Sequence, residues 1–75
     1  MKNRQEKLQR LLNWTGAPDV WEILRRANGD AVAPGICMNE DCNYIVDVEP
    51  DQRRGYCDEC DTNTVKSALI LAGLV

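Results

Sequence analysis

The chain has 75 residues, contains no histidine and no phenylalanine, and carries a formal net charge of −3. The absence of histidine excludes histidine-based catalytic triads, histidine proton shuttles and histidine-ligated metals. A core of this size alone supplies only about 3–5 kcal/mol, so we expect a single domain over residues 1–75 that needs a further source of stability.

The charge is unevenly divided along the sequence. Residues 1–29 carry six lysines and arginines against three acids, whereas residues 30–75 carry three against nine. The acidic second part repels nucleic acid at long range, so a nucleic-acid role requires a local basic patch. Residues 1–7 lead into no apolar signal region, and no apolar run reaches the ~20 residues that span a bilayer. We therefore expect a cytoplasmic protein in a reducing compartment, with no membrane partner.

Two short helices are predicted within residues 1–29. Apolar residues at positions 8–12 fall on one helical face, and Gly16 is a suitable end for this first helix. A second helix is predicted to begin near Pro18 and to end near Gly29, because apolar residues repeat at helical spacing between them. The short connection predicts an antiparallel or angled helical hairpin.

Trp14 and Trp21 flank the turn between these helices. Core packing is favoured for both in a chain with so few aromatic residues, and exposed anchors for a protein partner are the alternative. The first helix also carries a basic flank, which we assign to a solvated helix face: Lys2, Arg4, Lys7 and Arg10.

Four cysteines follow, with the spacing Cys37-x4-Cys42-x14-Cys57-x2-Cys60. Two close pairs separated by a hairpin-length segment are typical of a tetrahedral four-thiolate metal site. In a reducing compartment we favour a metal over a pair of disulfides. A structural zinc contributes roughly 10–16 kcal/mol in zinc-finger peptides, which exceeds the stability of the core itself. Four thiolates leave no coordination position for water, so we expect one structural Zn²⁺ per chain and no catalytic metal.

A β-hairpin is predicted between the cysteine pairs. Residues 44–49 alternate with a period of two, and residues 53–56 return toward the second pair after a turn. The metal ligands would lie at the base of this hairpin, and residues 33–35 would form the connector that precedes it. Asn43 and Asp61 directly follow the two cysteine pairs, where a left-handed backbone is useful.

Arg53 and Arg54 lie near the tip of the predicted hairpin, where a phosphate or an acidic surface can be reached. A solvated turn is the favoured interpretation, because lone basic turns are common and no aromatic stacking platform is evident beside them. Nucleic-acid binding through these two arginines is the alternative function, and the net charge disfavours it.

The final segment, residues 62–75, is predicted to contain a helix over residues 65–72, capped by a threonine. This helix is apolar on all sides, and Ser67 within it is interpreted as a small packing residue. Such a helix must be buried on all sides. Either the amino-terminal helices clamp it, or it forms a dimer or partner interface. Besides the tryptophans, the partner-binding candidates are Ile70, Leu71, Leu74 and Val75.

Residues 36–61 resemble zinc-ribbon proteins, in which two knuckles sit at the ends of a β-hairpin. Cys57-Asp58-Glu59-Cys60 fits the usual knuckle, whereas the knuckle from Cys37 to Cys42 is two residues longer. Rubredoxin-like iron sites are also similar, but both of their pairs usually have two intervening residues, so an iron redox carrier is the second alternative. The overall layout also looks like small uncharacterised proteins of bacteria and their phages.

Together these features predict a small α+β fold with a helical hairpin (1–29), a zinc-ribbon β-hairpin with a four-cysteine site (36–61) and a carboxyl-terminal helix (62–75). We expect no enzyme activity and no small-molecule substrate, because the cysteines are the only strong nucleophiles and a metal would engage them. The favoured function is a non-catalytic zinc module with a regulatory role that binds a protein partner or forms a homodimer.

Overall fold

The computed structural model describes residues 2–30 and 32–74 and confirms the small α+β class. Two helices, four strands and a final one-turn helix follow one another along the chain. None of the described helices is long and apolar enough to cross a membrane. The elements are α1 (Lys2–Thr15), α2 (Val20–Asp30), β1 (Ala33–Cys37), β2 (Ile45–Val48), β3 (Gly55–Cys57), β4 (Thr62–Ser67) and α3 (Ala68–Leu71).

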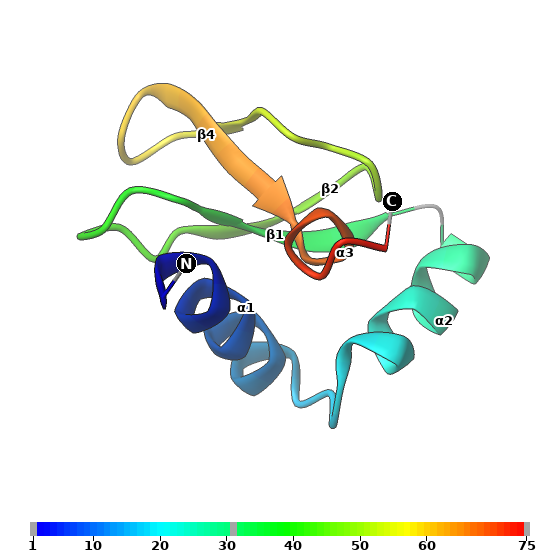
Figure 1. The fold of residues 1–75 in the computed structure, drawn as a ribbon. Coiled ribbons are helices and arrows are strands. Elements are labelled where there is room, and N and C mark those ends of the chain that lie inside the picture. The colour runs from blue at the N-terminus through cyan, green and yellow to red at the C-terminus, as the bar shows by residue number, and fades with distance from the viewer. Residues whose placement is uncertain (1, 31, 75) are drawn as a thin grey trace.

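The two amino-terminal helices form an angled pair. Gly16 adopts a φ of 75°, and its N–H donates to the carbonyl of Leu12 at 3.0 Å, which ends α1 at the predicted glycine. Near the start of α2, the side chain of Asp19 accepts a hydrogen bond from the N–H of Glu22 at 3.1 Å. Figure 1 shows α1 and α2 diverging from this turn, with α3 between them.

The strands form one antiparallel sheet in the order β2-β1-β4-β3. Residues 33–35, predicted as a connector, belong instead to β1, which is a central strand. Gly35 permits this close packing, since a Cβ there would lie 2.8 Å from Cγ2 of Val48 and 2.9 Å from Cγ1 of Val65. A proline and a glycine inside a strand are an unusual composition, which is why the sequence indicated a connector.

The predicted hairpin between the two cysteine pairs is wrong. β2 and β3 lie at opposite edges of the sheet, and each pairs with a different central strand. Each cysteine pair therefore lies at the connection of its own hairpin, β1–β2 or β3–β4. Pairing of β1 with β4 brings these two connections together. The alternation over residues 44–49 indicated a strand correctly, but alternation alone does not identify the neighbouring strand.

The carboxyl-terminal helix is shorter than the predicted span of residues 65–72. Its first part belongs to β4, whose β-branched residues favour extended backbone. Ser67, rather than a threonine, caps α3: its hydroxyl accepts from the N–H of Ile70 at 3.1 Å. The same hydroxyl donates to the carbonyl of Pro50 at 2.5 Å, so Ser67 also fixes the connection between β2 and β3.

The main core is built around α3, whose four residues are all buried. α3 contacts α1, α2 and β1, as Figure 1 shows, so the amino-terminal helices clamp the apolar segment. Ile70 and Leu71 are 3% and 5% exposed and serve as core residues in this fold, not as an accessible partner surface. Leu74 is half-buried and packs against the same core, and Val75 lies outside the described residues.

Arg4 connects α1 to the end of α3. Its Nε donates to the carbonyl of Leu71 at 2.9 Å, and its Nη2 donates to the carbonyl of Ile70 at 2.5 Å. These carbonyls lie at a helix end, where backbone acceptors need outside partners. Arg4 is exposed, as its assignment to a solvated helix face predicted, but its guanidinium also holds α1 to the end of α3.

Candidate metal centre

The four cysteines lie together where the two hairpin connections meet. Their sulfur atoms are all within 4.8 Å of one another, and the thiols are free. The Sγ atoms of Cys37 and Cys60 are 3.8 Å apart, and those of Cys42 and Cys57 are 3.6 Å apart. Four thiolates bound to zinc at about 2.3 Å in a tetrahedron would be separated by about 3.8 Å. The cluster therefore fits a tetrahedral metal ion, consistent with a zinc-ribbon-like site.

The second knuckle has the local geometry that presents sulfur to a metal. The N–H of Cys60 donates to Sγ of Cys57 at 3.3 Å, which stabilises negative charge on that sulfur. Asp61 has a φ of 60°, as predicted, and its N–H donates to the carbonyl of Cys57 at 2.8 Å. Asn43 does not share this conformation, because Asp61 is the only described non-glycine residue with positive φ.

The first knuckle is longer, and hydrogen bonds close it on both sides. The N–H of Cys37 donates to the carbonyl of Tyr44 at 2.9 Å, and the N–H of Cys42 donates to the carbonyl of Asn39 at 3.1 Å. From β4, the hydroxyl of Thr64 lies 3.1 Å from Sγ of Cys37. A thiolate at Cys37 can only accept, so this hydroxyl then donates to it.

Lys7 lies against the inside of the long knuckle and was missed by the sequence reasoning. Its side chain is 3% exposed, and its Nζ donates to the carbonyl of Asn39 at 2.7 Å, to the carbonyl of Cys42 and to Oδ1 of Asn43 at 3.5 Å. Among the described residues, Lys7 forms no ion pair with an acid. Its position one helical turn before the buried Leu11 was the available signal for burial.

A buried ammonium is costly unless nearby groups compensate its charge. Here the compensation in the described chain comes from carbonyl oxygens of the knuckle. Four thiolates around a divalent ion carry a net charge of about −2, and the Lys7 ammonium, bonded to the carbonyl of Cys42, would partly offset that charge. Lys7 therefore belongs to the electrostatic surroundings of the cysteine cluster, and its assignment to a solvated face is wrong.

The thiols of the cluster differ in pKa because their surroundings differ. Burial opposes ionisation of Cys37, but hydrogen bonds from Thr64 and from the Asn39 backbone outweigh it and lower the pKa of Cys37 to about 7. Burial raises the pKa of Cys57. At Cys42 a backbone hydrogen bond from Tyr44 favours the thiolate, but burial and the neighbouring sulfurs prevail and raise its pKa to about 12. Cys37 is thus the thiol that ionises near neutral pH, while the raised pKa values of Cys42 and Cys57 keep those two thiols protonated.

The two tryptophans do not pack in the core. Trp14 and Trp21 are 67% and 61% exposed, so the favoured expectation of core packing is wrong. Arg53 and Arg54 are also exposed, in the connection between β2 and β3. Nζ of Lys66 donates to the carbonyl of Arg53 at 3.4 Å, which places a third cation beside them.

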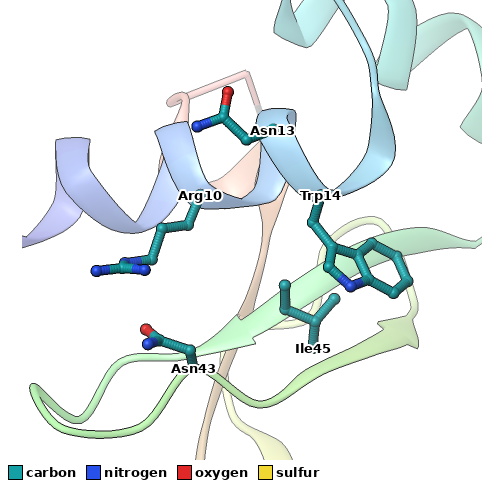
Figure 2. Close-up of a pocket in the computed structure, with 5 residues that line it drawn as sticks. All are labelled: Arg10, Asn13, Trp14, Asn43 and Ile45. Atoms are coloured by element: carbon teal, nitrogen blue, oxygen red, sulfur yellow. The ribbon is translucent and has the colours of Figure 1, made fainter.

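A pocket of about 350 Å³ lies between α1 and the start of β2. A smaller hollow of about 180 Å³ adjoins it and is lined in part by Lys7 and Glu40. Sequence reasoning did not predict this pocket, because its walls come from segments about 30 positions apart and no motif links them. Figure 2 shows the residues that line it: Arg10, Asn13, Trp14, Asn43 and Ile45.

Comparison with family models, with curated protein sequences and with solved structures finds no match for this chain. The chemistry of the cysteine cluster and of the surfaces around it therefore carries the functional conclusion.

Proposed function

We propose that this protein is a non-catalytic module that holds one structural Zn²⁺ and binds another protein. The observation that carries the first half is the set of four sulfurs at tetrahedral spacing within a largely buried cluster. Zinc bound by four thiolates has no open position for water or substrate, so it supplies stability and no catalysis. The residues that would hold the ion are Cys37, Cys42, Cys57 and Cys60.

The fold explains why a metal is useful at this place. The ligands belong to two hairpins that are joined by the pairing of β1 with β4 and, near the knuckles, by a hydrogen bond from the Tyr44 hydroxyl to Asp58 at 2.9 Å. One ion bound by all four cysteines would connect both hairpin tips directly. On this side of the sheet the buried cluster consists of three cysteines and Val65, and half-buried side chains surround it. Without a metal, this second cluster would be small and would contribute little to the stability of the fold, because a domain of this size has little other apolar surface to bury.

The protein-binding half of the proposal is supported by the exposed aromatic residues. Both tryptophans of the chain lie on the surface, and Tyr56 is 50% exposed. Tryptophan and tyrosine are enriched among the residues that dominate binding energy at protein interfaces. Exposed side chains of this kind contribute little to the stability of the fold, because their apolar surface remains in water. Contact with a partner would bury that surface.

Metal content and unfolding test the zinc half. Native mass spectrometry of the full chain, purified without chelator from medium containing zinc and iron, should give one zinc per chain. Circular dichroism should show unfolding when a chelator removes the ion. A metal-free protein that is folded, and whose circular dichroism spectrum does not change when chelator is added, would overturn the structural-metal proposal. A red, iron-containing protein with reversible one-electron reduction would replace it with the redox alternative.

Affinity capture with matched variants tests the binding half. The zinc-loaded chain should retain a specific partner, and a Trp14→Ala, Trp21→Ala double variant that still binds zinc should lose it. Equal recovery of proteins on the wild type, on the double variant and on a chelator-unfolded sample would contradict a specific binding module.

A further inference from the structure

A groove of about 350 Å³ lies between the second half of α1 and the start of β2, beside the region where α1 packs on β1. Figure 2 shows Arg10 and Trp14 extending from α1 toward the hairpin, with Arg10 opposite Asn43 and Trp14 opposite Ile45. The groove therefore has a polar end and an apolar end, and each end is built from both elements.

The polar end carries an unused positive charge. Arg10 is the only charged residue that lines the 350 Å³ pocket, although Glu6 and Glu40 line the adjoining hollow with it. The side chain of Arg10 makes no hydrogen bond or ion pair with any residue whose side chain the structure describes. A guanidinium binds a carboxylate through two parallel hydrogen bonds. At the other end, the indole of Trp14 is 67% exposed and lies beside Ile45, where an apolar side chain would be sheltered from water.

The hairpin side of the groove ends at an open strand edge. β2 pairs with β1 alone among the described strands. The N–H of Cys37 donates to the carbonyl of Tyr44, so residues 44 and 46 direct their backbone groups toward β1. The alternate residues, Ile45 and Asp47, then direct theirs outward. Such an edge can accept an extended peptide as an added strand.

The spacing of the two α1 side chains matches an extended peptide. Arg10 and Trp14 are one helical turn apart, which is about 6 Å along the axis of α1. Side chains on one face of an extended peptide repeat every second residue, at about 6.6–6.8 Å. One peptide can therefore place a carboxylate on Arg10 and an apolar side chain on Trp14 at the same time.

We propose that this groove binds an extended peptide segment of a partner protein in which an acidic residue and an apolar residue stand two positions apart. The peptide backbone pairs with the outward groups of Ile45 and Asp47. This inference rests on the proposed protein-binding function and names the chemistry of the partner.

The chain contains a matched control for this site. Trp21 and Arg25 also stand one turn apart and exposed, on α2. Arg25 is bound to Glu22 at 2.6 Å, and neither residue lines a described pocket. Substitutions on α2 thus remove the same kinds of side chain without altering the groove.

The test uses zinc-loaded full-length protein and an array of nonapeptides with Glu-Thr-Leu or Leu-Thr-Glu at the centre. Matched peptides carry Gln for Glu or Ser for Leu. We expect binding only when both the carboxylate and the apolar residue are present.

Protein variants test the groove itself. In fluorescence anisotropy, Trp14→Ala should weaken the affinity for the best peptide by about 30-fold, and Arg10→Glu should weaken it by at least about tenfold. Trp21→Ala and Arg25→Glu should change affinity by less than about twofold. In amide NMR spectra the largest shifts should fall at Ile45 and Asp47.

Each other outcome contradicts the inference in a distinct way. Peptides that bind equally well to the Arg10 and Trp14 variants, shown to be folded by NMR, would place binding elsewhere and leave the protein-binding proposal standing. No binding by any peptide would overturn the groove, and affinity capture would then decide the protein-binding function separately. A doubled native mass that Trp14→Ala abolishes would make a second copy of the chain the occupant instead.

Discussion

The Nζ of Lys7 lies 2.7 Å from the carbonyl oxygen of Asn39, so the first helix reaches directly into the knuckle that holds two of the four cysteines. The same ammonium also donates to the carbonyl of Cys42. Helix docking and metal-site geometry are therefore joined through one side chain. The long first knuckle, which departs from the usual two-residue spacing, wraps around this ammonium.

Replacing Lys7 with methionine should destabilise the zinc-loaded protein by about 2–3 kcal/mol, because the carbonyls of Asn39 and Cys42 lose a charged donor. Zinc affinity should fall as well, since the compensating positive charge is removed. Urea unfolding and competition with a zinc chelator measure the two effects. Arg10→Met, three residues along the same helix on an exposed side chain, should change stability by no more than about 0.5 kcal/mol. Equal effects of the two substitutions would show that Lys7 has no special role.

Zinc affinity should fall steeply on acidification. Thiolates bind the ion, so protons compete with it, and lower pH favours release. Cys37, with a pKa of about 7, is partly ionised at neutral pH, whereas Cys57 and Cys42 have raised pKa values and must lose their protons on binding. Below neutrality Cys37 is largely protonated as well, so zinc displaces at least three protons and the apparent Kd should rise by at least about 1,000-fold for each unit of acidification. Chelator competition between pH 6 and 8 measures this slope, and a pH-independent Kd would contradict thiolate ligation.

Ser67→Ala should cost about 2 kcal/mol of stability. The substitution removes the cap of α3 and the hydroxyl donor to the part-buried carbonyl of Pro50. Thermal and urea unfolding of the zinc-loaded protein measure the loss. Asn63→Ala, at an exposed position of β4, is the control and should lie within about 0.5 kcal/mol of the wild type. A neutral Ser67→Ala would mean that the β2–β3 connection is not held by this hydroxyl.

Gly35→Ala should destabilise the sheet by about 1–3 kcal/mol, because the added methyl would lie 2.8 Å from Cγ2 of Val48 and 3.1 Å from the carbonyl of Lys66. Adding Val48→Ala should recover part of the loss, so the double variant should be more stable than the sum of the two single effects predicts. Gly29→Ala, where no atom lies within 4 Å of the new methyl, should be neutral or slightly stabilising. Strict additivity between positions 35 and 48 would argue against this contact.

The nucleic-acid alternative makes its own prediction. If Arg53, Arg54 and the adjacent Lys66 contact phosphates, binding to a labelled oligonucleotide should weaken with salt and fail in an Arg53→Glu, Arg54→Glu variant. The net charge of −3 leads us to expect no measurable binding at physiological salt. Salt-sensitive binding that depends on these arginines would move nucleic-acid recognition ahead of peptide binding.

Sequence reasoning succeeded where the signal is local. Gly16 ends α1 as predicted, Asp61 takes the left-handed conformation after its knuckle, and the four cysteines expected to share one site do lie together. Each of these outcomes depends on spacing or on the conformational preference of one residue. Such preferences depend little on distant segments, although Asn43, predicted on the same ground as Asp61, does not adopt the left-handed conformation.

The failures concern which distant segments meet. The sequence of residues 44–49 does not indicate that β2 pairs with the strand before it. Pro34 and Gly35 are untypical of a central strand, so β1 was not predicted. Lys7 is buried because the knuckle offers it carbonyls some 32 positions away. Trp14 is 67% exposed and lines the pocket between α1 and β2, although the core around α3 lies close by. Tertiary packing decided all of these, and composition alone favoured the opposite result.

The strand order also has a consequence for how the domain assembles. Each hairpin joins neighbours in the sequence, so β1–β2 and β3–β4 close short loops that form rapidly and at low entropic cost. The pairing of β1 with β4 joins Gly35 to Ser67 and is the step with the largest chain-entropy cost in the sheet. A metal ion bound between the two hairpin tips acts on that one step. Each hairpin can form before the ion binds. We therefore expect zinc to change the rate at which the whole domain folds, and to have little effect on the rate at which either hairpin forms.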